Sequence, residues 1–401
     1  MNRVRLDNLE MKTLIDSTFI RLIGQEALAW NHRLLNADGI EEVDFVQNRK
    51  IALENFRSEI QKNNIRLKEN EKCQCGSVDF EKISSCDRFG MLFPTWICKS
   101  CGLISTSPVI DQQSSDLYYR KFYHPIHFDL NFSSHKTALY AQGQGEKIFR
   151  FVHPLLEDVK QLKILEVGMG TGSVLLEFKN AAFQSGIDVN ELGTELNQEC
   201  IRAAEKNGIA GLYGSFNEVI RQNMQFDLVI LSHVFEHFVD LPAELEKLTK
   251  ILKPSGLVYV EVPGVMSLHK KSEYDFDYLM YVTHAHNYHF NLTSLTQIFN
   301  LSGFELVRGN EEVETVFRKG FQRIDISKNY EQLKTYLVFL EQNRFYFSAL
   351  KRGLNDMKSQ LKAQEIQLQH LNTRIRKMES TWSWKITSPL RSINFRKLIN
   401  R

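Results

Sequence analysis

The stretch Ile164-Leu165-Glu166-Val167-Gly168-Met169-Gly170-Thr171-Gly172 decides the fold of this chain. An apolar run leads directly into three glycines at alternate positions, and an apolar segment that suits a helix, 174–178, follows them. Glycine is needed where a turn requires positive φ or where a side chain would hold a ligand away from the backbone. The spacing is G-x-G-x-G, whereas the dinucleotide fingerprint is G-x-G-x-x-G, so the motif predicts a strand, a tight turn and a helix without identifying the ligand.

Strands and helices are predicted to alternate about every 25 residues after this turn. The run Phe226–Ser232 is almost wholly apolar, which is typical of a strand covered on both faces. The breaker Lys253-Pro254-Ser255-Gly256 precedes another apolar run, 257–263. We therefore expect an α/β fold with a doubly wound parallel sheet, and a ligand beyond the carboxyl ends of its strands. Glu195, 23 positions after Gly172, ends a predicted strand and can accept hydrogen bonds from two ribose hydroxyls.

Five segments in order resemble the class I S-adenosylmethionine-dependent methyltransferases: EVGMGTG, GTELN, FDLVILSHVFEH, LKPSGLVYVEVP and HNYHFNLTSLTQIFNLSGF. The resemblance covers about residues 140 to 310. It implies a cofactor site in which Glu166, Gly168, Gly170 and Gly172 hold the methionine moiety, Glu195 holds the ribose, Gly214 and Ser215 lie near adenine, and Ser232 and His233 flank the sulfonium. Many members of the family have an acidic residue where this chain has Ser215, so adenine recognition departs from the family pattern there.

Histidines gather in the second half of this region. Methyl transfer from a sulfonium is an in-line displacement, so positioning supplies most of the rate. A sugar hydroxyl must also lose a proton, and an imidazole with a pKa near 6.5 suits that task. We expect the catalytic residues to be His237, His286 and His289. For His237 the alternative is a Glu-His pair that only caps the next helix, and for the later histidines the alternatives are one wet face of a strand or a metal site.

Two cysteine pairs precede this region. Cys73/Cys75 and Cys98/Cys101 are separated by 22 residues, each pair is followed by glycine, and four thiolates predict a structural zinc site. The first pair is C-x-C, one residue short of the usual knuckle. Cys86 and Cys200 are then expected to be buried or free thiols. A disulfide framework is the alternative, but the chain opens on no secretory signal and has no 18-residue apolar run, so we expect a reducing cytoplasm.

The cysteine region and the aromatic stretch 118–123 resemble the zinc-ribbon modules that precede methyltransferase domains in enzymes acting on nucleotide-linked sugars. In those enzymes the module helps to form the substrate pocket. The resemblance therefore implies a sugar substrate.

The C-terminal segment combines a heptad pattern with basic charge. From Leu333 to Met378 apolar residues recur at alternating steps of three and four, which predicts a helix that coils with a partner and makes the chain a homo-oligomer. A helix folded back on its own domain is the alternative. The stretch Thr381–Arg391 interleaves two tryptophans with cations, which suits the anionic surface of the inner membrane, and it resembles the SWRxTxPLR tail of bacterial glycosyltransferases. No RNA-binding motif accompanies it, so nucleic acid is not expected as a partner.

The sequence thus predicts five segments: a helical N-terminal segment (1–70), a zinc-ribbon module (71–125), a class I methyltransferase domain (126–325), a heptad helix (326–380) and a basic tail with tryptophans (381–401). We expect a methyltransferase that uses S-adenosylmethionine to methylate a sugar, either nucleotide-linked or on a surface glycan, with transfer to oxygen favoured. Transfer to carbon or nitrogen of a deoxysugar is one alternative. A non-catalytic coiled-coil scaffold is the other, and the intact Glu166, glycines and Glu195 argue against it.

Overall fold

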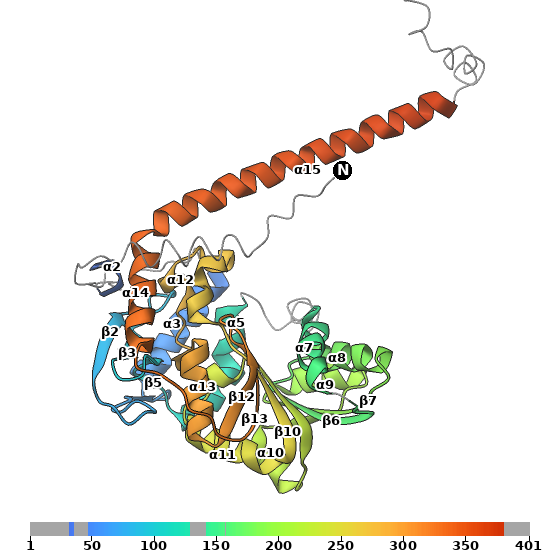
Figure 1. The fold of residues 1–401 in the computed structure, drawn as a ribbon. Coiled ribbons are helices and arrows are strands. Elements are labelled where there is room, and N and C mark those ends of the chain that lie inside the picture. Colours follow the sequence, from blue (N-terminus) through green and yellow to red (C-terminus); the bar gives the residue numbers. More distant parts are fainter. Residues whose placement is uncertain (1–31, 36–46, 129–141, 157, 381–401) are drawn as a thin grey trace, which may run out of the picture. The chain divides into compact units, whose positions relative to one another are not determined.

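The computed structural model describes residues 32–35, 47–128, 142–156 and 158–380 (Figure 1). The chain divides into two units, 1–342 and 343–401, and each is described by itself. Residues 1–31, 36–46 and the predicted basic tail 381–401 lie outside the described residues.

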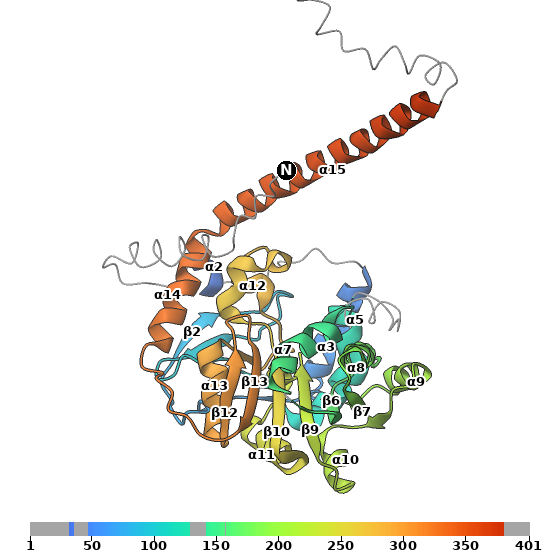
Figure 2. The ribbon, with the colours of Figure 1, turned by 45° about the vertical axis from the view of Figure 1, so that its right-hand side comes forward.

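A seven-stranded sheet forms the centre of the first unit, in the order β12-β13-β10-β9-β6-β7-β8 (Figures 1 and 2). Its strands are β6 (Gln161–Val167), β7 (Asp188–Glu195), β8 (Gly211–Tyr213), β9 (Phe226–Ser232), β10 (Leu252–Glu261), β12 (Phe304–Gly309) and β13 (Glu314–Lys319). The strands β6 to β10 are parallel to one another, but β13 is antiparallel to both β10 and β12. The expectation of a wholly parallel sheet was therefore wrong at one edge. A short connection joins β12 to β13, and a short connection allows only antiparallel pairing.

Helices cover both faces of this sheet, as the doubly wound prediction requires. They are α7 (Gln144–Val152), α8 (Ser173–Gln184), α9 (Gln198–Lys206), α10 (Phe216–Arg221), α11 (Leu241–Ile251) and α13 (Leu292–Leu301). Successive residues of β9 belong to different apolar clusters: Leu228 packs with α7 and α8, whereas Val229 packs with α11 and α13. Successive side chains of a strand point to opposite faces, so the two clusters lie on opposite sides of the sheet.

A second, four-stranded sheet carries the cysteine region, in the order β11-β4-β3-β2. Three of its strands come from that region, namely β2 (Phe80–Ser84), β3 (Thr95–Cys98) and β4 (Ile104–Thr106). The fourth, β11 (Tyr288–His289), comes from the segment after β10 and pairs antiparallel with β4. The strands β1 (Leu67–Lys68) and β5 (Val109–Ile110), which precede and follow β2 to β4 in the sequence, form a separate antiparallel pair. Residues on both sides of the predicted boundary at 125/126 therefore share one sheet.

An aromatic cluster joins the N-terminal segment to the cysteine region. Helix α3 (Gln47–Gln61) packs Phe56 against Phe93, Tyr118 and Phe122. Tyr118 is the last residue of α4 (Gln112–Tyr118), and Phe122 lies in the π-helix η1 (Tyr119–Tyr123). The helix α5 (His124–His127) follows directly. Within the segment 1–70, for which a helical structure was predicted, the structure describes α3, the single turn α2 (His32–Leu35) and the strand β1.

Short elements complete the first unit: η2 (His153–Leu155), η3 (Phe235–His237), η4 (Val265–Lys270), η5 (Ser272–Tyr274) and α12 (Tyr278–Tyr281). No helix among the described residues is both long and apolar enough to cross a bilayer.

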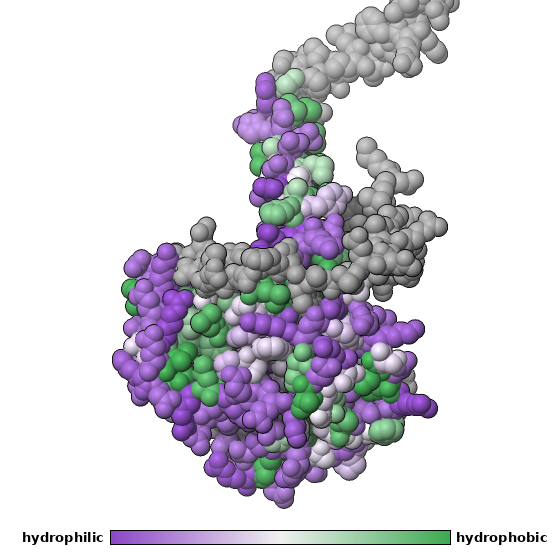
Figure 3. All heavy atoms as spheres, turned by 90° about the vertical axis from the view of Figure 1, so that its left-hand side faces the viewer, coloured by the Kyte–Doolittle hydropathy of each residue, from purple (hydrophilic) through white to green (hydrophobic). Residues whose placement is uncertain are grey.

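The predicted heptad helix is divided at Asn343 into α14 (Asn329–Gln342) and α15 (Arg344–Ser380). Leu333, Tyr336 and Leu340 of α14 are buried within the first unit, so the coiled-coil prediction was wrong for this part. Apolar residues spaced by three and four also mark a helix that packs on its own domain. Several heptad residues of α15 are exposed, namely Leu361, Leu368 and Ile375, and Figure 3 shows apolar side chains among hydrophilic ones along this helix.

Candidate functional site

The three glycines after β6 all have positive φ, between +54° and +73°. A Cβ atom on Gly168 would lie 2.7 Å from Cγ2 of Val234, and one on Gly172 would lie 3.0 Å from Cβ of Ala204. A Cβ atom on Gly170 would meet nothing within 4 Å. Packing inside the protein therefore explains Gly168 and Gly172, whereas Gly170 faces the open space that a ligand needs.

Two carboxylates lie beside this turn. Glu166 is 2 % exposed, and its Oε2 has no hydrogen-bond partner among the described residues. Burial raises the pKa of Glu166 to about 8, with a further contribution from Glu195. Glu195 accepts hydrogen bonds from the backbone N–H groups of Gly170 (3.0 Å), Leu196 (2.8 Å) and Asn197 (3.0 Å). An unpartnered buried acceptor next to open space suits a ligand with ammonium and hydroxyl donors, which S-adenosylmethionine has.

Gly214 and Ser215, the predicted adenine contacts, lie close to Glu195 because β8 pairs with β7. The Gly214 N–H donates to the backbone oxygen of Glu195 at 2.9 Å. Ser215 begins α10 as part of a capping box with Glu218, whose carboxylate accepts from the Ser215 N–H at 3.0 Å. Helix capping therefore accounts for Ser215, and contact with adenine remains a prediction.

A second group of polar residues follows β9. His233 comes directly after Ser232, has a φ of 55° and donates its backbone N–H to the Glu261 carbonyl oxygen. Burial opposes a charge on His233, but the carboxylates of Glu236 and Glu261 together raise its pKa. Val234 packs against Gly168, so this group borders the cofactor turn.

Glu236 is the centre of this group and is 1 % exposed. Its two carboxylate oxygens have no hydrogen-bond partner among the described residues. The nitrogens nearest to its Oε1 are Nδ1 of His233, Nε2 of His237 and Nε2 of His286, each at 3.8 Å. The structure thus brings His237 and His286, which are 49 positions apart, to one buried carboxylate. Residues Glu236, His237 and His286 are called the Glu236 cluster below.

Three hydrogen bonds fix the Glu236 cluster. Nδ1 of His237 lies 2.8 Å from the carbonyl oxygen of Ala285, and Asn287 donates to the backbone oxygens of Glu236 and His237 at 2.9 Å and 2.7 Å. A carbonyl oxygen only accepts, so Nδ1 of His237 carries a proton, and Nε2 is the ring nitrogen that faces Glu236.

His286 and His289 are neutral at neutral pH. Burial, together with His237 and His289, holds the pKa of His286 well below its usual value. Burial lowers the pKa of His289 to about 3, and its Nε2 lies 3.3 Å from Oγ1 of Thr106. His284 lies elsewhere, in a buried network with Asp87 (2.7 Å) and Tyr118 (2.9 Å).

Two tyrosines of η1 form an aromatic wall that the sequence analysis did not select. The rings of Tyr119 and Tyr123 each lie 5.9 Å from the His237 ring. Burial raises the pKa of Tyr123, and the charges of Glu236 and Glu195 raise it further. The charges of both Glu236 and Glu195, the predicted ribose acceptor, therefore act on the hydroxyl group of Tyr123. Helix distortions of the π type are frequent at functional sites. In the sequence, the aromatic stretch 118–123 was the available signal for the two tyrosines.

The four predicted zinc ligands lie together and are all free thiols. Sγ of Cys73 lies 3.5 Å from that of Cys101, and Sγ of Cys75 lies 3.7 Å from that of Cys98. Thiolates about 2.3 Å from one tetrahedral ion are roughly 3.8 Å apart, so the residues fit such an ion. Cys86 and Cys200 are buried thiols, as expected.

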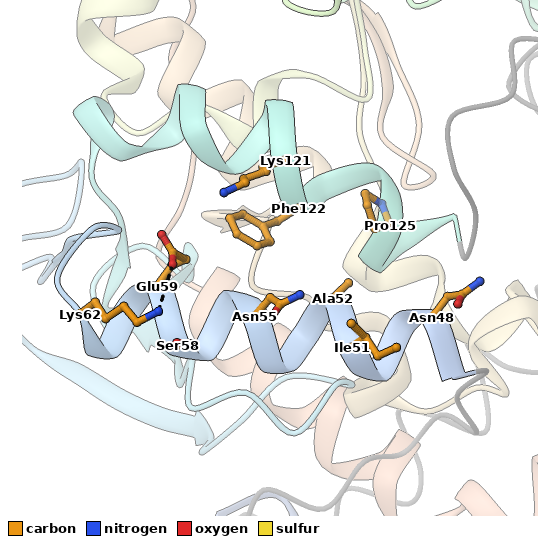
Figure 4. A pocket seen from close by; sticks show the side chains of 10 residues that line it. All are labelled: Asn48, Ile51, Ala52, Asn55, Ser58, Glu59, Lys62, Lys121, Phe122 and Pro125. Atoms are coloured by element: carbon orange, nitrogen blue, oxygen red, sulfur yellow. Dashed lines mark ion pairs between the residues drawn. The ribbon is translucent and has the colours of Figure 1, made fainter.

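An open groove of about 570 Å³ lies away from both sites, between α3 and the η1–α5 segment (Figure 4). Asn48, Asn55, Lys121 and the Glu59–Lys62 ion pair line it. No residue of the predicted cofactor site or of the Glu236 cluster lines this groove.

Glu166 gives a pH-dependent prediction. A carboxyl group with a raised pKa is protonated in the folded protein at pH values where it is ionised in the unfolded chain. The folded state therefore binds more protons between about pH 4.5 and 8, and the free energy of unfolding falls as pH rises through this range, by at most roughly 1.4 kcal/mol per pH unit. Urea unfolding of the parent chain and of Glu166→Gln across this range checks the slope. Parallel pH profiles for the two proteins would contradict the assignment.

Residues 140–308 match the family model described as a methyltransferase domain. The chain is 27% identical over 149 residues to C-methyltransferase NovU of Streptomyces niveus, a match that covers 36% of this chain and 33% of that protein. It is 26% identical over 147 residues to probable polyketide synthase 26 of Dictyostelium discoideum, covering 32% of this chain and 6% of the synthase. The chain thus spans about a third of the first of these curated relatives and a small part of the second.

Among solved structures, a protein from Pyrococcus horikoshii OT3 is 19% identical, with 51% of this chain and 98% of that chain covered and a TM-score of 0.34.

Proposed function

Because residues 140–308 form a class I S-adenosylmethionine-dependent methyltransferase domain, we propose that the protein transfers a methyl group to a hydroxyl oxygen of a sugar, either nucleotide-linked or part of a surface glycan. One observation carries this proposal. Glu236 is buried without a hydrogen-bond partner, and imidazoles and two tyrosines surround it beside the predicted cofactor crevice. Such a pocket suits a ligand with several hydroxyl groups, because each unpartnered acceptor requires a donor.

S-adenosylmethionine supplies an electrophilic methyl group when bound. On the protein side, Glu166 and Glu195 bind the cofactor's ammonium and ribose hydroxyl groups, and Gly170 leaves room for them. The Glu236 cluster removes the hydroxyl proton of the acceptor. Nε2 of His237 accepts that proton, and His286 and His289, whose pKa values burial lowers, hold the acceptor in place. General-base help of this kind contributes about 10² to 10⁴ in rate.

The test is a product analysis. The full chain is incubated with S-adenosylmethionine and a panel of nucleotide-linked sugars, and S-adenosylhomocysteine release is measured, with His237→Gln as the matched variant and the exposed His153→Gln as the control. We expect release with a sugar, an O-methyl product by NMR, and a loss of roughly 100-fold or more in His237→Gln only. Release with no sugar of the panel, or equal rates in His237→Gln, would contradict the proposal.

Transfer to carbon is the second candidate function. It is favoured by the printed name of the relative from Streptomyces niveus, a C-methyltransferase. The same NMR spectrum distinguishes the two outcomes, since a methyl group bonded to oxygen resonates well downfield of a methyl group bonded to carbon.

We further propose that Cys73, Cys75, Cys98 and Cys101 hold a structural zinc ion in a ribbon that forms one side of the acceptor pocket. The spacing of the thiols supports this. The pairing of β4 with β11 supports the second part, because Thr106 of β4 donates to the backbone oxygen of His286 at 2.7 Å.

We also propose that α15 pairs with α15 of a second copy and that the basic tail contacts the anionic inner surface of the cytoplasmic membrane. The exposed heptad residues of α15 support the first part, since a helix with such an apolar stripe is stabilised by a partner. The second part depends on the composition of residues 381–401 alone.

Truncation separates these two parts. A chain ending at Gln342 keeps the buried α14 and should be a monomer that still binds S-adenosylmethionine, because the predicted cofactor residues lie between 166 and 233. A chain ending at Ser380 should keep the oligomer but lose binding to anionic vesicles. Light scattering and vesicle sedimentation measure the two properties. A monomeric full-length chain would contradict the pairing of α15, and vesicle binding by the chain ending at Ser380 would contradict the role of the tail.

A further inference from the structure

We propose that the Glu236 cluster binds a divalent transition-metal ion of the zinc type, distinct from the ion of the four cysteines. Oε1 of Glu236, Nε2 of His237 and Nε2 of His286 lie within 4.8 Å of one another. One carboxylate oxygen and two imidazole nitrogens form a donor set that zinc and its first-row neighbours prefer.

The distances favour an ion over direct contact. Glu236 Oε1 lies 3.8 Å from Nε2 of His237 and 3.8 Å from Nε2 of His286, which is too far for a hydrogen bond. Two ligands with bonds of about 2.1 Å to one ion can be separated by up to roughly 4.2 Å. The side chains therefore leave a gap of the size that one ion bridges.

Burial is the second, independent observation. The Glu236 carboxylate is 1 % exposed and has no hydrogen-bond partner among the described residues. Burying a carboxylate without a partner is costly, and a bound cation removes that cost. His233, with Nδ1 also 3.8 Å from Oε1 of Glu236, is half exposed.

A hydrogen bond orients the imidazole of His237 for this task, whereas Nδ1 of His286 has no hydrogen-bond partner among the described residues. Nδ1 of His237 donates to the Ala285 carbonyl oxygen, the arrangement that orients a metal-binding histidine and leaves Nε2 free. Thr106 and Asn287 hold the backbone on which His286 stands. The three donors come from two segments, 235–237 and 283–287, that hydrogen bonds already connect, so little rearrangement is needed for binding.

What the ion would do depends on the proposed function. Bound to the acceptor hydroxyl, it would acidify that group, and the ion rather than a free His237 nitrogen would then activate the oxygen. The O–H bond breaks and its proton passes to Oε2 of Glu236, the O–CH3 bond forms, and the bond from the methyl carbon to the donor sulfur breaks with its electron pair on sulfur. Two cis positions on the ion would suit two neighbouring hydroxyls of a sugar.

The test is zinc binding by the full chain, with neither S-adenosylmethionine nor a sugar present. Protein that has been dialysed against a weak chelator, so that the four-cysteine site stays loaded, is titrated with zinc in a calorimeter. We expect one binding event in the parent chain, a loss of affinity of about 100-fold or more in Glu236→Gln and in His286→Gln, and no change in His153→Gln. A cobalt(II) titration should give a spectrum without a thiolate charge-transfer band, which locates the event outside the cysteines.

The outcomes are distinct. No binding event, equal affinity in the two cluster variants, or binding of magnesium in preference to zinc would overturn the metal site. Methylation of a sugar by protein without this ion would leave the proposed function in place and remove the ion from it. Zinc binding that depends on Glu236, without methylation of any sugar, would support the site and contradict the proposed function.

Discussion

Replacing Cys98 by serine is expected to abolish zinc binding by the four cysteines and, with it, acceptor methylation. Binding of a structural zinc ion is worth roughly 10 to 16 kcal/mol in small zinc peptides, and this free energy is folding free energy. Cys98 ends β3 and is fully buried, so the variant loses both the ligand and the order of the strand. β3 pairs with β4, which holds the His286 backbone, and the defect should therefore reach the acceptor pocket.

Metal analysis, activity and cofactor binding are measured together in this experiment. S-adenosylmethionine binding should survive, because residues 166 to 233 lie on the seven-stranded sheet rather than on the cysteine sheet. Cys86→Ala is the matched control, since Cys86 is buried in the same region but is not part of the thiol group. Full metal content in Cys98→Ser would show that these thiols do not bind the ion. Loss of cofactor binding would show that the two sheets do not behave separately.

Glu195→Ala should weaken S-adenosylmethionine binding by about 10 to 150-fold, because a charge-assisted hydrogen bond contributes roughly 1.5 to 3 kcal/mol. Gly170→Val should abolish it, since the valine side chain enters the open space beside the turn and must adopt a φ of +54°. Calorimetry with the cofactor measures both effects, and thermal unfolding shows whether each variant is folded.

Asp188→Ala is the control for Glu195→Ala. Asp188 begins the same strand at the opposite end and is exposed. Glu191, the other acidic residue of β7, already pairs with Lys179 at 2.7 Å. Unchanged binding in Glu195→Ala would mean that the ribose acceptor is another residue, and weaker binding in Asp188→Ala would point to a general effect on β7.

The parts of the fold that depend on local pattern could be predicted from the sequence. The apolar runs and glycines placed β6, β7, β9 and β10, and the thiol spacing placed four cysteines together. The direction of β13 could not be predicted, because strand periodicity carries no information on parallel or antiparallel pairing. The α14 heptads were misread because their apolar spacing is the same for a coiled coil and for a helix packed on its own domain.

The Glu236 cluster was only half predicted. His237 and His286 were selected for their chemistry, but Glu236 was given no role of its own beyond the alternative of a capping Glu-His pair, since nothing in a sequence marks a carboxylate as unpartnered. That property depends on the hydrogen bonds between segments 235–237 and 283–287 and on the pairing of β11 with β4. Tyr119 and Tyr123 were missed for the same reason, because their place beside His237 is a tertiary contact between distant segments.

The strand pairing between β4 and β11 limits how such an enzyme can acquire a different substrate specificity. A cysteine module taken from another protein would bring its own edge strand, and that strand must match Tyr288 and His289 in register before it can support the neighbouring loop. Exchange of the module alone should therefore leave an unpaired edge and a misplaced His286. Under the proposed function, the module and residues 283–289 determine the substrate together, so these two distant pieces of chain must vary as one.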